Sequence, residues 1–214
     1  MRRDVGKLTS SGAAAGAAII GSLASKYESS GNAGTVARTK GDHGGASYGI
    51  YQFTANQGSA KGFVQYLKNV DPSAYKTLVS HPVGSSGFDV AWKQVAASNK
   101  NFSQYQHNYA KQVFYDPTAK SVLKNTGLDV NKRSSAVQAA LWSTAVQHGQ
   151  GGALRVIKNA GITPMMSDQE ILRRLYAERG ANNGAKYFKS SSKKIQAAVA
   201  DRFKRELQDA LSML

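Results

Sequence analysis

Two carboxylates near the N-terminus have the residue types and the spacing that acid-base chemistry requires. Glu28 follows a run of small apolar residues, 13–27, and Asp42, the next acidic residue along the chain, lies in a glycine-rich stretch, 41–45. Cleavage of a glycosidic bond uses two such groups, because one protonates the leaving oxygen while the other stabilises positive charge or positions water. Glu28 is therefore the candidate general acid, with Asp42 as its helper.

The element that must position Glu28 is a predicted helix over 13–27. Its apolar side chains recur every four residues and form one stripe, made of Ala15, Ile19, Leu23 and Tyr27. Glu28 would lie on the shoulder of this stripe, where partial loss of solvent raises the pKa of a carboxyl group towards the range of a general acid. The alternatives are a solvated Glu28 at a helix end and an Asp42 that caps its own turn.

Beyond these residues the chain reads as helices separated by polar loops, so we expect a mainly α fold with at most a small irregular β element near 46–54. The stretch 31–45 is rich in turn formers and predicts a functional loop without regular structure. Helices are predicted over 59–69, 72–80, 86–98, 102–113, 117–124, 134–147, 151–159, 167–179 and 193–213. The length suits a single domain over 1–214, made of a polar arm at 1–12, the catalytic core motif at 13–54, a helical body at 55–192 and a C-terminal amphipathic helix at 193–214.

Two charged residues fall on apolar helix faces. Arg179 lies on the apolar stripe of the penultimate predicted helix, and Glu206 lies on that of the last. A charge on a buried face costs several kcal/mol unless it is paired. We therefore predict that Arg179 and Glu206 form a structural ion pair, or that each finds a nearer partner in Glu178 or Arg202. A second catalytic acid at Glu206 is the alternative.

Composition and charge limit the partners. The chain has 28 basic and 13 acidic residues, and its formal net charge of +15 favours association with polyanions such as the anionic bacterial envelope. The basic residues are scattered rather than interleaved with aromatic ones, so we expect no dedicated nucleic-acid site. Cysteine is absent and the four histidines show no ligand spacing, so we predict neither a metal nor a cofactor.

The N-terminus imitates a signal peptide poorly. Two arginines precede an apolar segment, but Asp4 and the polar stretch 6–12 separate these charges from it. The apolar segment is also too short to span a bilayer. We expect no export signal and no transmembrane segment, with a releasable anchor as the alternative.

Three short motifs in order, SKYESSG, GDHG and YGIYQ, carry a family resemblance; they occupy 25–31, 41–44 and 48–52. Together they resemble the catalytic core of goose-type lysozymes and lytic transglycosylases of the lysozyme-like superfamily. They are most similar to the versions that bacteriophages and bacterial secretion spikes carry. The resemblance covers 19–54 and implies a lysozyme-like fold with Glu28 as the general acid and Asp42 as the loop aspartate that assists it.

The resemblance also implies roles for the neighbours of the two carboxylates. Ser29 would help to hold the sugar or the acid, and the side chain of Gln52 and the backbone of Tyr48 and Gly49 would shape the cleft. Apart from the resemblance, His43 either tunes the neighbouring Asp42 or is an exposed loop residue. The tyrosines are expected to be mostly core residues, and stacking of Tyr48 and Tyr51 on sugar rings is the alternative. The other substrate-binding candidates lie in the third motif or directly before it, and are Ser47, Tyr48, Gly49, Tyr51 and Gln52.

The chain departs from the family at two places. Goose-type enzymes carry a further acidic residue after the glutamine turn, where this chain has Phe53 and Thr54. The Tyr-Asn-Ala-Gly element of transglycosylases has only an approximate counterpart at 146–149, which makes Gln147 and His148 substrate-binding candidates. His148 also suits a hydrogen-bonded core position, because it shares a helical face with apolar residues. Hydrolysis and formation of a 1,6-anhydro product both stay open.

By this resemblance the chain is a peptidoglycan glycosidase, either a muramidase or a lytic transglycosylase, that cleaves the β-1,4 bond between N-acetylmuramic acid and N-acetylglucosamine. It would be phage-encoded, and would reach the bacterial cell wall with other virion proteins or through lysis or secretion machinery. The alternatives are a non-enzymatic virion or wall-binding protein with a degenerate lysozyme fold, a polyanion-binding protein, and a chitosanase. The polycationic substrate of a chitosanase suits so basic a protein poorly.

Overall fold

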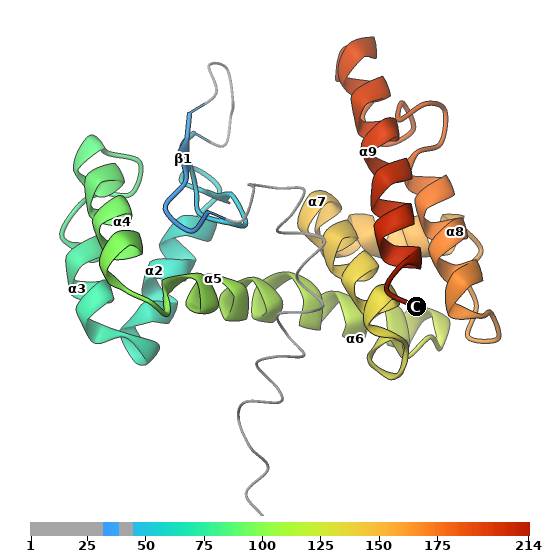
Figure 1. The fold of residues 1–214 in the computed structure, drawn as a ribbon, viewed down its shortest axis with the longest axis horizontal. Helices are drawn as coiled ribbons and strands as arrows, with labels where there is room; N and C mark the ends of the chain where they lie inside the picture. Colours follow the sequence, from blue (N-terminus) through green and yellow to red (C-terminus); the bar gives the residue numbers. More distant parts are fainter. Residues whose placement is uncertain (1–31, 39–44) are drawn as a thin grey trace, which may run out of the picture.

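The computed structural model describes residues 32–38 and 45–214. Figure 1 shows two groups of elements joined by the helix α5 (Phe102–Ala110). The first group combines a small sheet with three helices, α2 (Ser59–Val70), α3 (Pro72–Val79) and α4 (Ser86–Ser98). The second group consists of α6 (Asp116–Thr126), α7 (Ser135–Asn159), α8 (Asp168–Arg179) and α9 (Lys193–Leu211). The predicted mainly α fold is confirmed.

The sheet has three short antiparallel strands in the order β1 (Val36–Ala37), β2 (Ser47–Tyr48) and β3 (Phe53–Thr54). Tyr48 pairs with Val36 on one side and with Phe53 on the other. Two of the strands confirm the β element predicted near 46–54. The prediction of no regular structure over 31–45 is wrong for β1, because a strand of two residues forms by pairing with β2 and leaves no alternating pattern of its own.

Side-chain caps fix where the helices begin. The hydroxyl groups of four serines each accept a hydrogen bond from the backbone N–H three residues further on, at Ser85, Ser134, Ser167 and Ser192. Asp71 does the same before α3, whose first residue is Pro72. These caps are readable from the sequence, and the predicted starts of the capped helices agree with the structure to within one residue.

Of two predicted helix breaks, the first is wrong and the second is confirmed. The helices predicted over 102–113 and 117–124 are joined without a loop by a π-helical turn, Lys111–Tyr115. The helices predicted over 134–147 and 151–159 both lie in α7, whose backbone leaves the helical region at Gly149 (φ 68°, ψ 174°), inside the predicted break. Glycine adopts this conformation at little steric cost, so the break is a kink at one residue that separates two helical parts.

Aromatic side chains build a core that runs through both groups of elements. In the first group the ring centroid of Trp92 lies 5.0 Å from that of Phe102 and 5.4 Å from that of Phe63. Trp142 of α7 continues this core, with its ring 6.0 Å from that of Tyr51. The turn that carries Tyr51 is therefore packed between the two groups.

Candidate functional site

The site candidates divide according to where they lie. Four of them, Glu28, Ser29, Asp42 and His43, lie outside the described residues, as does the predicted helix 13–27. One described set comes from β2 and the turn that follows it, and consists of Ser47, Tyr48, Gly49, Tyr51 and Gln52. A second set comes from α7, α8 and α9, and consists of Gln147, His148, Arg179 and Glu206.

The turn between β2 and β3 is held in shape by its own backbone and by Gln52. Gly49 has a positive φ of 71°, and its N–H donates to the carbonyl of Thr35 at 2.8 Å. Gln52 has φ 51°, and its side-chain Nε2 donates to the carbonyl of Gly49 at 2.9 Å. The amide of Gln52 thus stabilises a left-handed turn from within, while its role in shaping a cleft stays a prediction.

Gln106 of α5 joins the chain just after the first motif to the third motif, and sequence reasoning missed it. Its Oε1 accepts from the N–H of Ile50 at 2.9 Å, and its Nε2 donates to the carbonyl of Ala33 at 2.9 Å. Trp92 donates to the same carbonyl at 2.8 Å. The side chain of Gln106 is completely buried. It therefore fixes the chain shortly after Glu28 against the turn at Gly49, although a lone glutamine in a polar helix gives no sequence signal for this role.

Tyr48 and Tyr51 lie in the core, as expected for most of the tyrosines, and their burial argues against stacking on sugar rings. The two residues are only 0% and 4% exposed. The hydroxyl of Tyr48 donates to Oδ1 of Asp89 at 2.6 Å, and burial, with the Asp89 hydrogen bond, raises its pKa well above the ordinary value. The hydroxyl of Tyr51 lies 2.6 Å from Nδ1 of His107, and burial raises its pKa as well. Both rings belong to the core, and Ser47 is almost buried beside them.

Gln147 and His148 are occupied by contacts within the second group. Oε1 of Gln147 accepts from Nη2 of Arg179 at 2.8 Å. The His148 ring packs 5.4 Å from that of Tyr187 and 5.7 Å from that of Phe188. Burial and two nearby arginines lower its pKa to about 4. Its Nε2 is buried without a hydrogen-bond partner among the described residues. His148 is therefore a neutral residue that packs against aromatic rings, and its Nε2 does not make the hydrogen bond expected of a core histidine.

The predicted ion pair of Arg179 and Glu206 is present. Nη1 of Arg179 lies 3.0 Å from Oε2 of Glu206, and both side chains are completely buried. Glu206 also accepts from Ser143 at 2.9 Å and from Arg202 at 2.7 Å. Burial raises the pKa of Glu206, but the two arginines lower it further, so the net direction is down. A carboxyl group kept ionised in this way is unsuited to donate a proton, which argues against Glu206 as a second acid.

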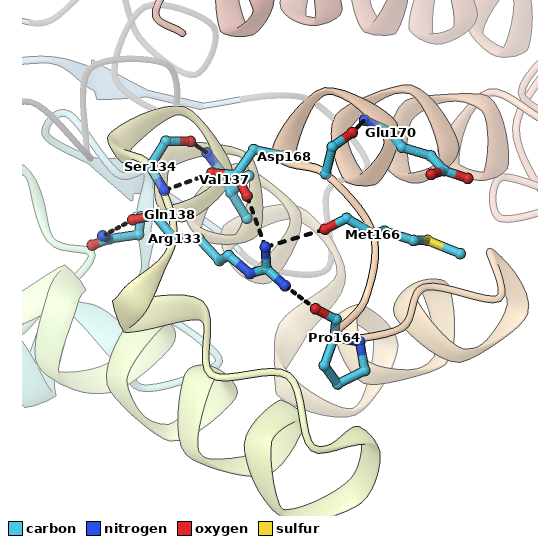
Figure 2. Close-up of polar contacts among 9 residues, drawn as sticks. Arg133, Ser134, Val137, Gln138, Pro164, Met166, Asp168 and Glu170 are labelled. Carbon is cyan, nitrogen blue, oxygen red and sulfur yellow. Dashed lines mark hydrogen bonds and ion pairs between the residues drawn. The ribbon is translucent and has the colours of Figure 1, made fainter.

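A second polar cluster surrounds Arg133, for which the sequence patterns give no signal (Figure 2). Its Nη1 donates to the carbonyl of Met166 and to Oδ1 of Asp168, each at 3.1 Å, and its Nη2 donates to the carbonyl of Pro164. The other oxygen of Asp168 accepts from the N–H of Ser134 at 2.8 Å. Burial raises the pKa of Asp168, but these donors lower it further. The cluster fixes the loop before α8 to the start of α7.

A hollow of about 560 Å³ adjoins the segment that follows Glu28. It lies between this segment and α4, and is lined by Asn32, Ala33, Gly34, Lys93, Ala96 and Ala97. Within residues 32–38 and 45–214, no group of three or more His, Cys, Asp or Glu side chains could hold a metal ion. In the same part of the chain, no helix has the length and apolar character needed to cross a membrane.

Sequence comparison finds one family. A family model described as "Type VI secretion system spike protein VgrG3-like, C-terminal" matches residues 20–207. The type VI secretion system spike protein VgrG3 of Vibrio cholerae serotype O1 is 32% identical over 179 residues. The matched part is 80% of this chain but only 16% of that protein, so the chain corresponds to a small part of this relative.

Solved structures with a similar fold include chitosanases. The native chitosanase of Bacillus subtilis MY002 superposes with a TM-score of 0.64 at 20% identity, covering 92% of this chain and 89% of that one. The GH46 chitosanase of Gynuella sunshinyii in complex with chitotetraose superposes with a TM-score of 0.63 at 16% identity, covering 96% and 90%. At such low identity the likeness establishes the shared mainly α fold.

Proposed function

The chain belongs to the family of type VI secretion system spike proteins of the VgrG3-like C-terminal type, and from this premise we propose that it is a glycosidase that degrades peptidoglycan after delivery by secretion machinery. The family favours this route over the phage origin that the motifs alone suggest. The proposed substrate bond is the β-1,4 bond between N-acetylmuramic acid and N-acetylglucosamine. The proposed partners are the wall polymer and the anionic envelope around it.

One observation carries the proposal: Gln106 ties the chain just after the first motif to the third motif. Gln106 bonds to Ala33 on one side and to Ile50 on the other, so the chain after Glu28 and the glutamine turn lie side by side. A buried side chain that satisfies two backbone groups holds both segments in one geometry. A general acid needs such a fixed surrounding to meet the glycosidic oxygen at hydrogen-bond distance.

In the proposed mechanism Glu28 donates its proton to the glycosidic oxygen while the bond from this oxygen to the anomeric carbon breaks. Asp42 lowers the energy of the oxocarbenium-like transition state through its negative charge. Attack by water on the anomeric carbon gives a reducing end, and the water proton returns to a carboxylate. Attack by the sugar's own 6-hydroxyl group gives the 1,6-anhydro product instead.

Charge supports peptidoglycan over chitosan as the substrate. The net charge of +15 attracts the anionic envelope and repels a polycationic sugar chain. This attraction acts between exposed groups, so we expect wall association to weaken as salt screens it over a Debye length of roughly 8–10 Å. A chitosanase is the second candidate, because the solved structures that share the fold include chitosanases.

The test compares variants on purified bacterial sacculi and on chitosan. We expect wild-type protein to clear sacculi and to leave chitosan intact, and Glu28→Gln to bind sacculi without clearing them. Asp201→Asn serves as the control, because Asp201 is an exposed residue of α9 that pairs with Lys204, far along the chain from the motifs. Clearing of sacculi by Glu28→Gln at the wild-type rate refutes Glu28 as the acid, and cleavage of chitosan alone favours the second candidate.

A further inference from the structure

A hollow of about 370 Å³ lies between α8 and α9, which Figure 1 shows side by side in the second group. Residues within 173–180 form one wall and residues within 200–207 form the other, and Asn183 of the connecting loop also lines it. No motif residue that the structure describes takes part. The volume falls within the range of roughly 300–1,000 Å³ that small-molecule sites occupy.

Small residues on the two helices leave this space open. Ala177, Gly180 and Ala200 line the hollow and carry at most one methyl group, so neither helix fills it. The rings of Tyr176 and Phe203 also line it, and both are almost completely buried, so they form its base. The interior is therefore apolar, and a hydrocarbon group that enters it leaves water.

The charged side chains that line the hollow are both cationic. They are Arg173 and Lys204, and none of the acidic residues in the described part of the chain lines it. Lys204 shares its ammonium group with Asp201, at 3.0 Å. Arg173 is exposed, and none of the ion pairs among the described residues includes it. Its guanidinium can bind a carboxylate through two parallel hydrogen bonds, so Arg173 is the principal group for an anion.

A further cation lies behind the base of the hollow. The guanidinium carbon of Arg179 lies 4.2 Å from the ring centroid of Phe203 and 5.0 Å from that of Tyr176. Its counter-ion Glu206 also binds Arg202, so two arginines contact one carboxylate. This buried cluster therefore does not offset the positive charge that Arg173 gives to the hollow.

We infer that this hollow binds an anionic amphiphile, a free molecule with one hydrocarbon chain and a carboxylate head group. The chain occupies the apolar space between Ala177 and Ala200, and the carboxylate pairs with Arg173. An apolar interior with a few polar groups that fix orientation is typical of small-molecule sites. The site goes beyond the proposed glycosidase activity, because no residue assigned to that activity lines it.

The shape of the hollow favours this occupant over a partner helix or a membrane. Residues 173–180 of its wall span only about 10 Å, which is roughly the diameter of one helix, and the loop that carries Asn183 closes one end. The exposed large apolar side chains of the described residues, such as Met165 and Ile195, lie outside it. The hollow thus lacks the apolar surround with which a protein enters a bilayer.

The experiment measures binding of decanoate to the whole chain by titration calorimetry, and maps the bound site by chemical shifts of the backbone amides. Acetate lacks the chain, decan-1-ol lacks the charge, and decyltrimethylammonium reverses it. The variants are Arg173→Glu, which reverses the charge, and Ala177→Leu, which fills the hollow from an exposed position. Their matched controls are Lys76→Glu and Ala198→Leu, at exposed helical residues that do not line the hollow. Thermal unfolding checks the fold of each variant.

We expect decanoate to shift the amides of 173–180 and 200–207, and each methylene removed from its chain to weaken binding about 4-fold. Arg173→Glu and Ala177→Leu should each weaken binding at least about 10-fold, because one loses the charge-assisted hydrogen bonds and the other the space. Lys76→Glu and Ala198→Leu should bind decanoate with an affinity within about 2-fold of the wild type.

Several outcomes overturn the inference. They are equal affinity for decanoate and for decan-1-ol or decyltrimethylammonium, shifts confined to other elements, and unchanged affinity in both variants. Binding only to vesicles of phosphatidylcholine and phosphatidylglycerol would assign the hollow to a membrane, and self-association lost in Ala177→Leu would assign it to a second copy. If a variant does not fold, the shift map of the wild type decides. Glu28→Gln should bind decanoate as the wild type does, so this test is independent of the proposed function.

Discussion

Arg179 and Glu206 form an ion pair in which both side chains are completely buried, with Nη1 of Arg179 at 3.0 Å from Oε2 of Glu206. The pair joins the last residue of α8 to α9, and Ser143 adds α7 through its hydrogen bond to the same oxygen. The guanidinium carbon also lies 4.2 Å from the ring centroid of Phe203. This arrangement locks three helices of the second group to one another.

Removing one partner of this pair should strongly destabilise the fold. We expect Glu206→Gln to lower the free energy of unfolding by about 3–5 kcal/mol, because Arg179 would keep a buried charge without its counter-ion. Urea unfolding followed by circular dichroism measures the loss. Glu170→Gln is the control, since Glu170 forms an exposed pair with Arg174 and should change stability by less than about 0.5 kcal/mol. Equal stability of the two variants would contradict the prediction.

The imidazole of His148 should make the fold sensitive to mild acid. Its pKa is about 4 in the folded chain, below the 6.5 of an exposed histidine, because of burial and the nearby Arg179 and Arg202. The folded state then binds fewer protons than the unfolded one, so the full contribution of the neutral imidazole to the free energy of unfolding is present above pH 6.5. The free energy of unfolding falls by about 3 kcal/mol as the pH drops to 4.

Unfolding measured at several pH values checks this dependence. We expect His148→Gln to flatten the dependence of the free energy of unfolding on pH between 6.5 and 4, because it removes the imidazole that takes up a proton there. Carboxylates with a lowered pKa, such as Glu178, lose their contribution only at lower pH. His81→Gln, a change at an exposed histidine, should keep the wild-type slope. A slope that survives in His148→Gln would assign the acid sensitivity to another group.

Gly49 should tolerate no side chain. A Cβ atom there would lie 2.2 Å from Oε1 of Gln106, and the φ of 71° is itself unfavourable for other residues. We expect Gly49→Ala to lower the free energy of unfolding by about 1–3 kcal/mol. It should also reduce wall clearing, since it displaces Gln106, which links the chain after the first motif to the third motif. Gly151→Ala is the matched control, because its Cβ would meet no atom within 4 Å. This control should gain up to about 1 kcal/mol from helix propensity; a loss as large as that of Gly49→Ala would contradict the account.

Arg133 should not be replaceable by lysine. Its guanidinium serves two carbonyls and a carboxylate at once (Figure 2), and a single ammonium group on a flexible stem cannot reproduce that planar fork. We expect Arg133→Lys to cost about 1–3 kcal/mol in the free energy of unfolding. Arg174→Lys keeps an exposed pair within one helix and should stay within about 0.5 kcal/mol of the wild type. Thermal unfolding of both proteins distinguishes the two results.

Local features of the sequence predict most of the helices. Serine caps and apolar stripes are short-range features, so the starts of α4, α8 and α9 follow from them. The two charges on apolar helix faces likewise predict the ion pair of Arg179 and Glu206, because a buried charge without a counter-ion is strongly destabilising. The break at Gly149 also follows from the sequence, since glycines separate the two predicted helices there, but the π-helical turn at Lys111–Tyr115 was not predicted.

The site is less predictable than the fold, because its supports come from residues distant in sequence. Gln106 and Asp89 are single polar residues in predicted helices, and their roles depend on segments more than 40 positions away. The same holds for Tyr48 and Tyr51, which belong to a conspicuous motif but are buried by helices that close over them. A motif thus indicates which segment is functional, but the depth of each side chain is set by tertiary packing.

The most direct test of the central claim is mass spectrometry of purified sacculi after incubation with the wild-type protein and with Glu28→Gln. We expect soluble muropeptides from the wild type, ending in either a reducing or a 1,6-anhydro N-acetylmuramic acid, and none from Glu28→Gln. The mass of the ends identifies whether water or the sugar's 6-hydroxyl group attacks. Release of the same muropeptides by Glu28→Gln, or no release by folded wild-type protein, would contradict the assignment of Glu28 as the general acid of a wall-degrading glycosidase.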